Sequence, residues 1–190
     1  MKTSVKKITL LFIATVISSF ALSCSSNDDG GGGASAAPGT IRAKVDGTNF
    51  ESSTMTTIAT KVNVNGTAHT ITVYGTEMNM TNGSSKNINI IMNVPDLEPR
   101  SYDIGGDNLT GFIATYTEAS GTIGNLTSTT WAAPYEGGEV AGKITITEIT
   151  ETGIKGTFNF KVQKQNSNES WAGEFKNITE GAFDVEFIQF

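Results

Sequence analysis

The sequence predicts an all-β fold of about eight to ten short antiparallel strands, arranged as a two-sheet sandwich or, as the alternative, a closed barrel. Two hairpin patterns support this prediction. One covers residues 58–74 with Asn65-Gly66 at the turn, and the other covers residues 142–163 with Glu151-Thr152-Gly153 between two strands. No stretch after Cys24 shows apolar residues at helical spacing, so we expect almost no helix.

Residues 1–23 are typical of a secretion signal. Three lysines precede an apolar run, residues 8–20, which is too short to remain as a membrane-spanning helix. The small or apolar residues Ala21, Leu22 and Ser23 before Cys24 resemble the cleavage site of a bacterial lipoprotein. We therefore expect cleavage after Ser23 and lipidation of Cys24 with palmitate-type acyl chains, which would make the membrane a partner.

Residues 24–39 are expected to form a flexible tether, followed by a single β domain over residues 40–190. The tether contains four consecutive glycines and no aromatic side chain, so it can bury little apolar surface. Its Asn27-Asp28-Asp29 segment resembles the acidic surface-export signal of Bacteroidota lipoproteins. The alternative is that the acidic residues only keep the linker soluble.

The charge balance argues against nucleic acid as a partner. The chain has 13 Lys and Arg against 19 Asp and Glu, a formal charge of −6. Loss of residues 1–23 would remove three lysines and leave a charge of −9. Such a chain repels polyphosphate. Because Cys24 is the one cysteine, its lipidation would also exclude disulfides, a thiol nucleophile and cysteine metal ligands from the domain.

Apolar and polar residues alternate clearly in three stretches of the first half of the domain. Residues 41–45 predict a strand that ends in an Asp46-Gly47 turn. In the first hairpin, a two-residue loop would pair Val62 with His69 and Ile58 with Val73 on one apolar face. Residues 86–94 predict a third strand, and its inward residues are Ile88, Ile90, Met92 and Val94.

The second half is expected to begin with an irregular segment. Residues 109–116 predict a strand, but residues 117–138 show no periodicity and predict a long loop. The second hairpin would pair Ile144 with Phe160 and set Lys143 opposite Lys161. Residues 171–178 and 181–190 predict the last two strands, with Phe183, Val185 and Phe187 inward.

Four stretches carry a resemblance to known sequences. They are Val45-Asp46-Gly47 with Asn49-Phe50, residues 142–147, residues 153–160 and residues 178–183. Together with the lipoprotein signal, they resemble uncharacterised outer-membrane lipoprotein families of the Bacteroidota, domains of unknown function. The resemblance implies an all-β domain in the cell envelope and implies no activity and no functional residues.

The sequence contains few candidate residues for a catalytic or metal site. The single histidine, His69, falls on an inward strand face, where a packed structural role is expected, and we expect no cofactor and no metal. Residues 103–108 offer oxygen ligands of the kind that calcium binds, and the alternative interpretation is an ordinary Asp/Asn/Gly turn. A pair of carboxylates that catalyses hydrolysis is a further alternative. The acidic residues fit solvated positions instead, namely Glu148, Glu151, Glu174 and Glu186.

Aromatic residues outside the apolar faces are the remaining candidates for a ligand site. Tyr116, Trp131, Tyr135 and Trp171 fall at strand ends or in the irregular segment, where an exposed ring could stack on a sugar or anchor a protein. The alternative is that these rings cap the core. We therefore expect a lipid-anchored, non-catalytic binding or accessory module for a glycan or an envelope protein, located at the outer membrane, with the cell surface and the periplasmic leaflet as the two alternatives for its side. A structural subunit of an envelope complex and a carboxylate-dependent hydrolase are the alternatives.

Overall fold

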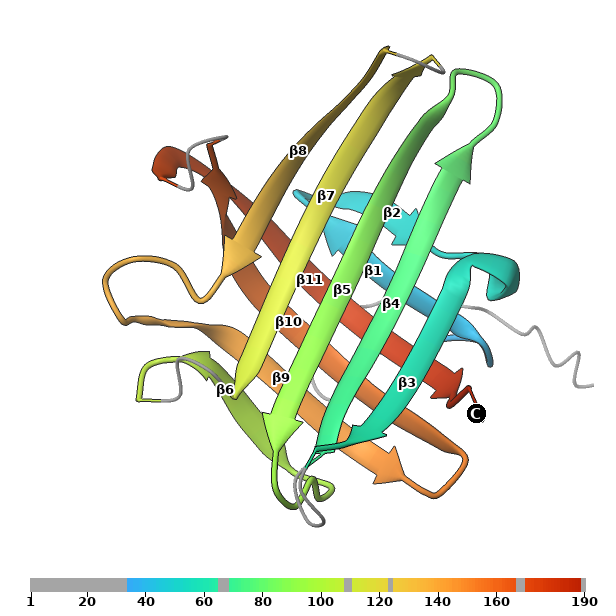
Figure 1. Ribbon diagram of the computed structural model, residues 1–190, viewed down its shortest axis with the longest axis vertical. Helices are drawn as coiled ribbons and strands as arrows, with labels where there is room; N and C mark the ends of the chain where they lie inside the picture. The colour runs from blue at the N-terminus through green and yellow to red at the C-terminus, as the bar shows by residue number, and fades with distance from the viewer. Residues whose placement is uncertain (1–33, 65–68, 108–110, 123–124, 167–169, 189–190) are drawn as a thin grey trace, which may run out of the picture. The chain divides into compact units, whose positions relative to one another are not determined.

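The computed structural model describes residues 34–190 except 65–68, 108–110, 123–124, 167–169 and 189–190 (Figure 1). Eleven strands and one 3₁₀ turn, η1 (Thr54–Thr56), make up the described structure. The strands are β1 (Thr40–Val45), β2 (Thr48–Glu51), β3 (Thr57–Asn63), β4 (His69–Asn79), β5 (Ser84–Val94), β6 (Ser101–Gly105), β7 (Phe112–Thr122), β8 (Asn125–Ala133), β9 (Val140–Ile149), β10 (Gly153–Gln165) and β11 (Trp171–Glu186). The all-β prediction is confirmed, with one strand more than the upper expected number. Within the described ranges, no helix has the length and hydropathy to span a membrane.

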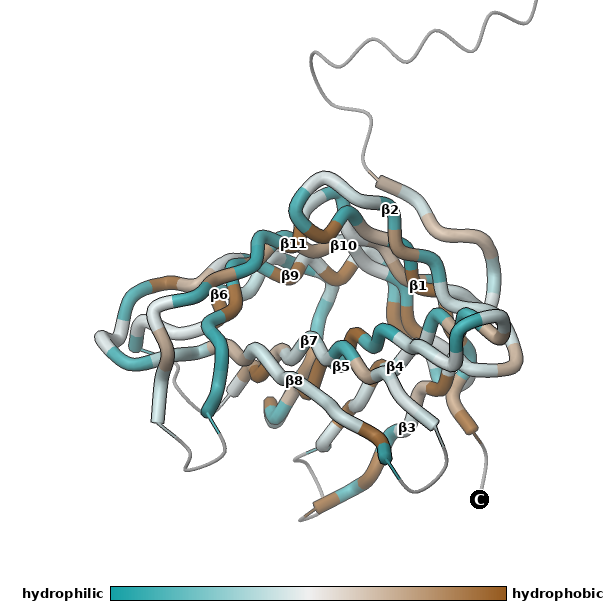
Figure 2. The backbone as a smooth tube through the Cα atoms, turned by 90° about the horizontal axis from the view of Figure 1, so that it is seen from above, coloured by the Kyte–Doolittle hydropathy of each residue, from teal (hydrophilic) through white to brown (hydrophobic). Residues whose placement is uncertain are grey.

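The strands form one antiparallel sheet that bends into two layers. The order is β2-β1-β11-β10-β8-β7-β5-β4-β3, with β9 beside β10 and β6 beside β9. β3, β4, β5, β7 and β8 form one layer, and the other strands cross behind them (Figure 1). Seen from above, the strands lie in two layers (Figure 2). The sheet is not closed into a barrel, so the sandwich form of the prediction is confirmed.

The core lies between the layers and follows the period of two in each strand. Ile88, Ile90 and Met92 of β5 are fully buried, as the sequence predicts. On the facing layer, Phe158 stacks on Phe160 at a centroid distance of 5.3 Å and on Phe183 at 6.2 Å. Among the described residues, the core side chains come from residues 41–187, so this part of the chain holds its own hydrophobic core.

The predicted register of the first hairpin is wrong by one residue. Asn63 pairs with His69 and Ala59 with Val73, so Ile58 and Val62 face solvent. The cause is the end of the chain: Phe187 bridges to Ala59, and the Ile188 N–H donates to the Ala59 carbonyl at 2.9 Å. The small Ala59 side chain fits this close approach. The predicted Asn65-Gly66 turn lies outside the described residues.

The predicted register of the second hairpin is wrong by two residues over Gly142–Ile146 and by one residue next to the turn. Ile144 pairs with Phe158, and a bulge follows between β9 and the start of β10. A shift of two keeps Ile144 and Ile146 on their predicted face, because successive residues alternate. It also places Lys143 opposite Asn159 rather than opposite another lysine. Lys143 forms an ion pair with Asp103 of β6.

The predicted irregular segment 117–138 is mostly strand, which corrects that prediction. β7 continues to Thr122 and β8 runs from Asn125 to Ala133. Alternation is hidden in the sequence because the inward side of these strand ends is polar, as at Thr127 and Thr129. Hydropathy alone therefore shows no contrast between the two faces.

Candidate functional site

Two of the four predicted aromatic residues, Tyr116 and Trp131, lie side by side in the core. Tyr116 on β7 pairs with Trp131 on β8, and their rings are 5.8 Å apart at a tilt of 40°. Tyr116 is fully buried and Trp131 is 3% exposed. The expectation that these two rings are exposed for stacking is therefore wrong, because both occupy inward strand positions. Tyr116 ends the predicted strand 109–116, and Trp131 lies in β8, a strand that the sequence pattern did not reveal.

The other two predicted aromatic residues lie in different surroundings. Tyr135 packs edge-on against Phe175 of β11, with centroids 5.4 Å apart. Trp171 is half-buried at the first residue of β11 and pairs with Gln165. Among the described residues, no ring contact joins either side chain to the Tyr116–Trp131 pair. The structure does not gather the four aromatic residues into one site.

A charged cluster lies directly next to the Tyr116–Trp131 pair. The Lys176 ammonium lies 4.7 Å from the Trp131 ring centroid and 3.3 Å from Oε1 of Glu118. It is also 3.6 Å from Oδ2 of Asp46, in the turn between β1 and β2. The Tyr116 hydroxyl donates a 2.9 Å hydrogen bond to the same Glu118 oxygen. Glu118 thus connects the buried aromatic pair to the Lys176 ammonium.

Glu118 also lines a groove on the inward face of the strand ends of β5, β7 and β8. We call it the inner-face groove, and its volume is about 320 Å³. Glu118 and Lys86 supply charge, and hydroxyl groups come from all three strands. The lining residues are Ser84, Ser85, Lys86, Glu118, Ala119, Ser120, Thr127 and Thr129. The groove therefore presents both hydrogen-bond donors and acceptors.

Two buried polar atoms beside this groove have no hydrogen-bond partner among the described residues. They are Nε1 of Trp131 and Oε2 of Glu77. Glu77 is directly opposite Lys86 in the register, and their charged groups are 4.0 Å apart. A buried polar atom without a partner costs roughly 1–3 kcal/mol, so such atoms are candidates for bonding to a bound molecule.

The environment of Tyr116 keeps its phenol neutral. Burial raises the pKa of Tyr116 above its ordinary value, and the hydrogen bond to the Glu118 carboxylate raises it further. A neutral phenol can donate to Glu118 across the physiological pH range. The hydrogen bond thereby holds the carboxylate in one position at the edge of the groove.

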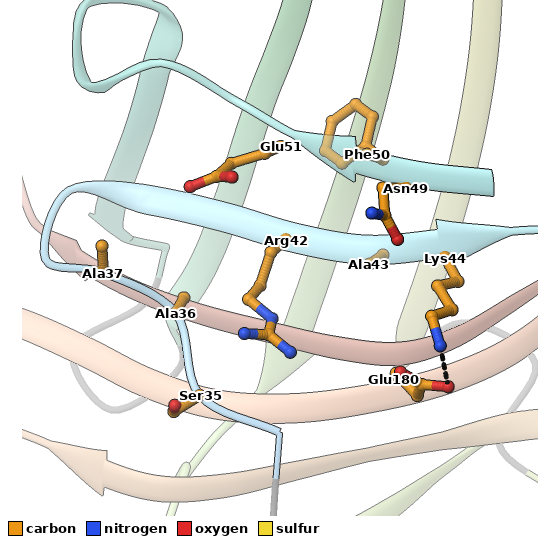
Figure 3. Close-up of a pocket in the computed structure, with 10 residues that line it drawn as sticks. All are labelled: Ser35, Ala36, Ala37, Arg42, Ala43, Lys44, Asn49, Phe50, Glu51 and Glu180. Atoms are coloured by element: carbon orange, nitrogen blue, oxygen red, sulfur yellow. Dashed lines mark hydrogen bonds and ion pairs between the residues drawn. The ribbon is translucent and has the colours of Figure 1, made fainter. Parts of the chain in front are cut away.

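A larger groove of about 490 Å³ lies on the outer side of β1 (Figure 3). The segment Ser35–Ala37 forms one wall, Arg42 extends into the groove, and Lys44 pairs with Glu180 at 2.7 Å. Residues 34–39 thus contact the domain, although they belong to the expected tether. Among the described residues, no ring–ring contact and no buried polar atom without a partner falls in this groove, which makes it the weaker candidate.

His69 and the acidic candidates occupy separate places. His69 is half-buried at the start of β4 and lines a third groove with Asp96 and Glu98. Glu148 and Glu174 form surface ion pairs with Lys155 and Lys164. Over the described residues, no three His, Cys, Asp or Glu side chains form a metal-binding group. Asn108 of the expected turn and Cys24, the expected lipidation site, lie outside the described residues.

Sequence reasoning missed Lys86, Glu118 and Lys176. One signal was available, because Glu118 lies two positions after Tyr116 and Lys86 lies two before Ile88. Both therefore continue the inward face of strands whose other inward residues are apolar. Lys176 lies two positions before the buried Ile178 and therefore continues the inward face of β11.

Comparison with known proteins finds one family. A family model described as a domain of unknown function, DUF6252, matches residues 37–184. No curated protein and no solved structure shows a significant match. The matched range contains the inner-face groove and the whole Tyr116–Trp131 environment.

Proposed function

The chain belongs to the DUF6252 family of unknown function, and on that premise we propose that it is a non-catalytic binding module of the cell envelope. Cys24 would carry the lipid that holds it at the outer membrane, with the domain displayed at the cell surface. The lysine-rich start, the apolar run and the small residues before Cys24 support this anchor. The acidic Asn27-Asp28-Asp29 segment supports display at the surface and a Bacteroidota origin.

The inner-face groove is the proposed binding site. The observation that carries this proposal is the convergence of hydroxyl groups from three strands with a lysine and a glutamate above a buried aromatic pair. Hydroxyl and charged groups that line one groove suit a ligand that is itself rich in hydroxyl groups. We therefore place a glycan first among the ligands and a polar protein segment second.

The contacts of Glu118 support binding rather than proton transfer in this proposal. Its Oε1 already accepts a hydrogen bond from Tyr116 and faces the Lys176 ammonium. A carboxylate held between a phenol and an ammonium is oriented to accept hydrogen bonds from sugar hydroxyls. The hydrolase alternative needs two carboxylates converging on one bond, and no such pair emerges in the described groove residues.

Paired valine substitutions test the groove. Thr129→Val removes one hydroxyl from the groove, and Thr115→Val makes the same change on the outward face of β7. Both positions are half-buried strand positions, so both variants should fold alike. The chain from Ser25 onward, which retains every described residue, is screened on a glycan array and its hits are titrated by calorimetry.

We expect Thr129→Val to weaken binding of the hits by about fivefold to tenfold, because one hydrogen bond is lost. Thr115→Val should bind like the unaltered chain. Equal binding by both variants would contradict the assignment of the groove. If no glycan binds, capture of peptides from envelope extracts decides between the second ligand class and no ligand at this groove.

A second candidate function is a structural subunit of an envelope assembly. One specific observation favours it: half of β8 has no partner strand on one side among the described residues. Assemblies of β domains are commonly built through such strand edges.

A further inference from the structure

Residues 125–130 of β8 form a strand edge that has no partner strand among the described residues. β8 pairs with β7 along its whole length, from Asn125 to Ala133. On its other side, within the described part of the chain, only Trp131 and Ala132 pair, with Lys164 and Gln163 of β10. In Figure 1 the upper part of β8 rises away from β10 and β11. Residues 125–130 therefore present alternate backbone N–H and C=O groups to solvent over roughly 20 Å.

Within the described residues, this edge lacks the features that usually protect an exposed strand. The six residues Asn125-Leu126-Thr127-Ser128-Thr129-Thr130 contain no charge and no proline, and their pairing with β7 shows no bulge. Leu126 is 69% exposed. Edge strands of monomeric proteins are normally blunted by lysine, proline, a bulge or a covering segment.

The other sheet edges are shorter or protected. β3 carries Lys61 and is covered at Ala59 by the chain segment around Phe187. β2 has four residues, among them Glu51. β6 has five residues, and its Asp103 is paired with Lys143. The edge of β8 is thus the one described edge that combines length with the absence of charge.

We propose that this edge pairs with the same edge of a second copy of the chain. In an antiparallel pair related by a two-fold axis at Ser128, Ser128 lies opposite its own copy. Thr127 lies opposite Thr129, and Leu126 lies opposite Thr130. Each pair falls on one face of the combined sheet, because the positions differ by even numbers. The sheets of the two copies would then be continuous.

The residue types favour a second copy over a different partner. A strand that pairs with the same strand of a second copy places identical side chains close together. Such contacts are destabilising between like charges and not between hydroxyl groups. Residues 125–130 are uncharged and four of the six carry hydroxyl groups. Hydroxyl pairs such as Thr with Thr are favourable across strands. A partner of opposite charge would find no charge on this edge to recognise.

The pairing would also complete the inner-face groove. Thr127 and Thr129 line the groove on its β8 side, where the strand edge is open. In the proposed dimer the same two residues of the second copy continue that wall. The inference does not rest on the proposed ligand, since association is measured in the absence of any ligand.

Sedimentation equilibrium of the chain from Ser25 onward tests the proposal. The contact is one strand wide, so we expect a monomer–dimer equilibrium that depends on concentration. Because the chain is acidic, raising the ionic strength from about 0.02 to 0.3 M should strengthen the dimer by screening repulsion. A monomer at about millimolar concentration would overturn the proposal.

Substitutions at Ser128 locate the contact. Ser128→Lys sets two lysines opposite each other and should raise the dissociation constant about tenfold. Met55→Lys adds the same charge at a 91% exposed position in η1 and should leave dimerisation unchanged or slightly stronger. Circular dichroism confirms that both variants fold. A dimer that Ser128→Lys leaves intact would overturn the proposed edge.

Cross-linking gives an independent readout. Since the chain from Ser25 onward lacks Cys24, Ser128→Cys introduces its only thiol. The two thiols face each other at the axis, so mild oxidation should yield a disulfide-linked dimer. Thr48→Cys on the edge of β2 is the matched control and should remain monomeric. Equal cross-linking of both variants would contradict the proposal.

Discussion

Tyr116 and Trp131 show how one side chain can belong to both the core and a polar site. Their rings are buried between the layers, while the Tyr116 hydroxyl reaches Glu118 and the Lys176 ammonium lies over the Trp131 ring. Buried tyrosine hydroxyls usually find a partner, because an unpaired polar group in the core is costly. The aromatic residues therefore support the groove from beneath rather than bind a ligand by stacking.

Replacing Tyr116 by Phe tests this role through pH. Below pH 10, the ordinary pKa of tyrosine, the variant should be less stable by about 1–3 kcal/mol because the hydrogen bond to Glu118 is lost. Above pH 10 the unfolded chain releases the phenol proton, whereas the folded chain retains it because its pKa is raised. The stability of the unaltered chain should then fall with rising pH, and the difference from the variant should shrink.

The measurement is urea unfolding of both proteins at a series of pH values from 8 to about 11. A constant difference across this range would contradict the stabilisation of the neutral phenol. A variant as stable as the unaltered chain below pH 10 would contradict the hydrogen bond to Glu118.

At the scale of elements, hairpin register depends on distant parts of the chain. The first hairpin is set one residue away from the sequence prediction, which leaves Val62 51% exposed and Val73 fully buried. The segment around Phe187 determines this choice, because it docks on Ala59. Local turn residues thus identify the hairpin, and a contact with the end of the chain selects its register.

Threonine substitutions distinguish the two registers. Val73→Thr should lower the free energy of unfolding by about 1–3 kcal/mol, because it buries a hydroxyl without a partner. Val62→Thr should change it by less than about 0.5 kcal/mol, because the side chain faces solvent. Urea unfolding monitored by tryptophan fluorescence measures both.

These two variants serve as each other's control, since the chemical change is the same. In the register expected from the sequence both valines face inward, so equal losses would indicate that register. A larger loss at Val62 than at Val73 would contradict the observed pairing altogether.

At the scale of the whole molecule, one bent sheet separates two environments. Strand segments between the layers carry the apolar core, and the projecting ends of β4, β5, β7 and β8 carry polar residues on the same inward face. The layers are linked through the short β8–β10 pairing. Because β8 leaves β10 after two residue pairs, the same feature produces both the open groove and the unpaired edge.

The proposed anchor is tested on the whole protein in cells. Cys24→Ser should move the protein from the membrane fraction to soluble fractions, because the acyl chains that hold it are no longer attached. Immunoblotting of fractionated cells measures the distribution. Retention of the variant in the membrane would contradict the lipid anchor.

Surface display needs a separate experiment. Protease treatment of intact cells should degrade the unaltered protein if the domain faces outward. Protection until the cells are lysed would place the domain on the periplasmic side and leave the anchor itself unaffected.

The sequence predicted the regular strands well and the groove poorly. Residues of β5 and β11 alternate between apolar and polar, so the inward positions of Ile88 and Phe183 follow from periodicity. Glu118 and Lys86 face inward as well, but they lie beyond the core, where polar residues occupy both faces. Hydropathy cannot distinguish such a strand end from a loop. The segment 117–138 was therefore predicted to be irregular.

By itself the sequence determined the all-β class, the presence of the two hairpins and the inward faces of β5, β10 and β11, because these depend on side-chain alternation and turn residues close together in the chain. Only the tertiary structure decided the registers, the association of Glu118 with Lys176, and the unpaired half of β8. Each of these depends on contacts between residues far apart in sequence: Ala59 with Phe187, β7 with β11, and β8 with β10. Local patterns do not encode which distant strands meet, since that choice minimises the free energy of the whole packed sheet.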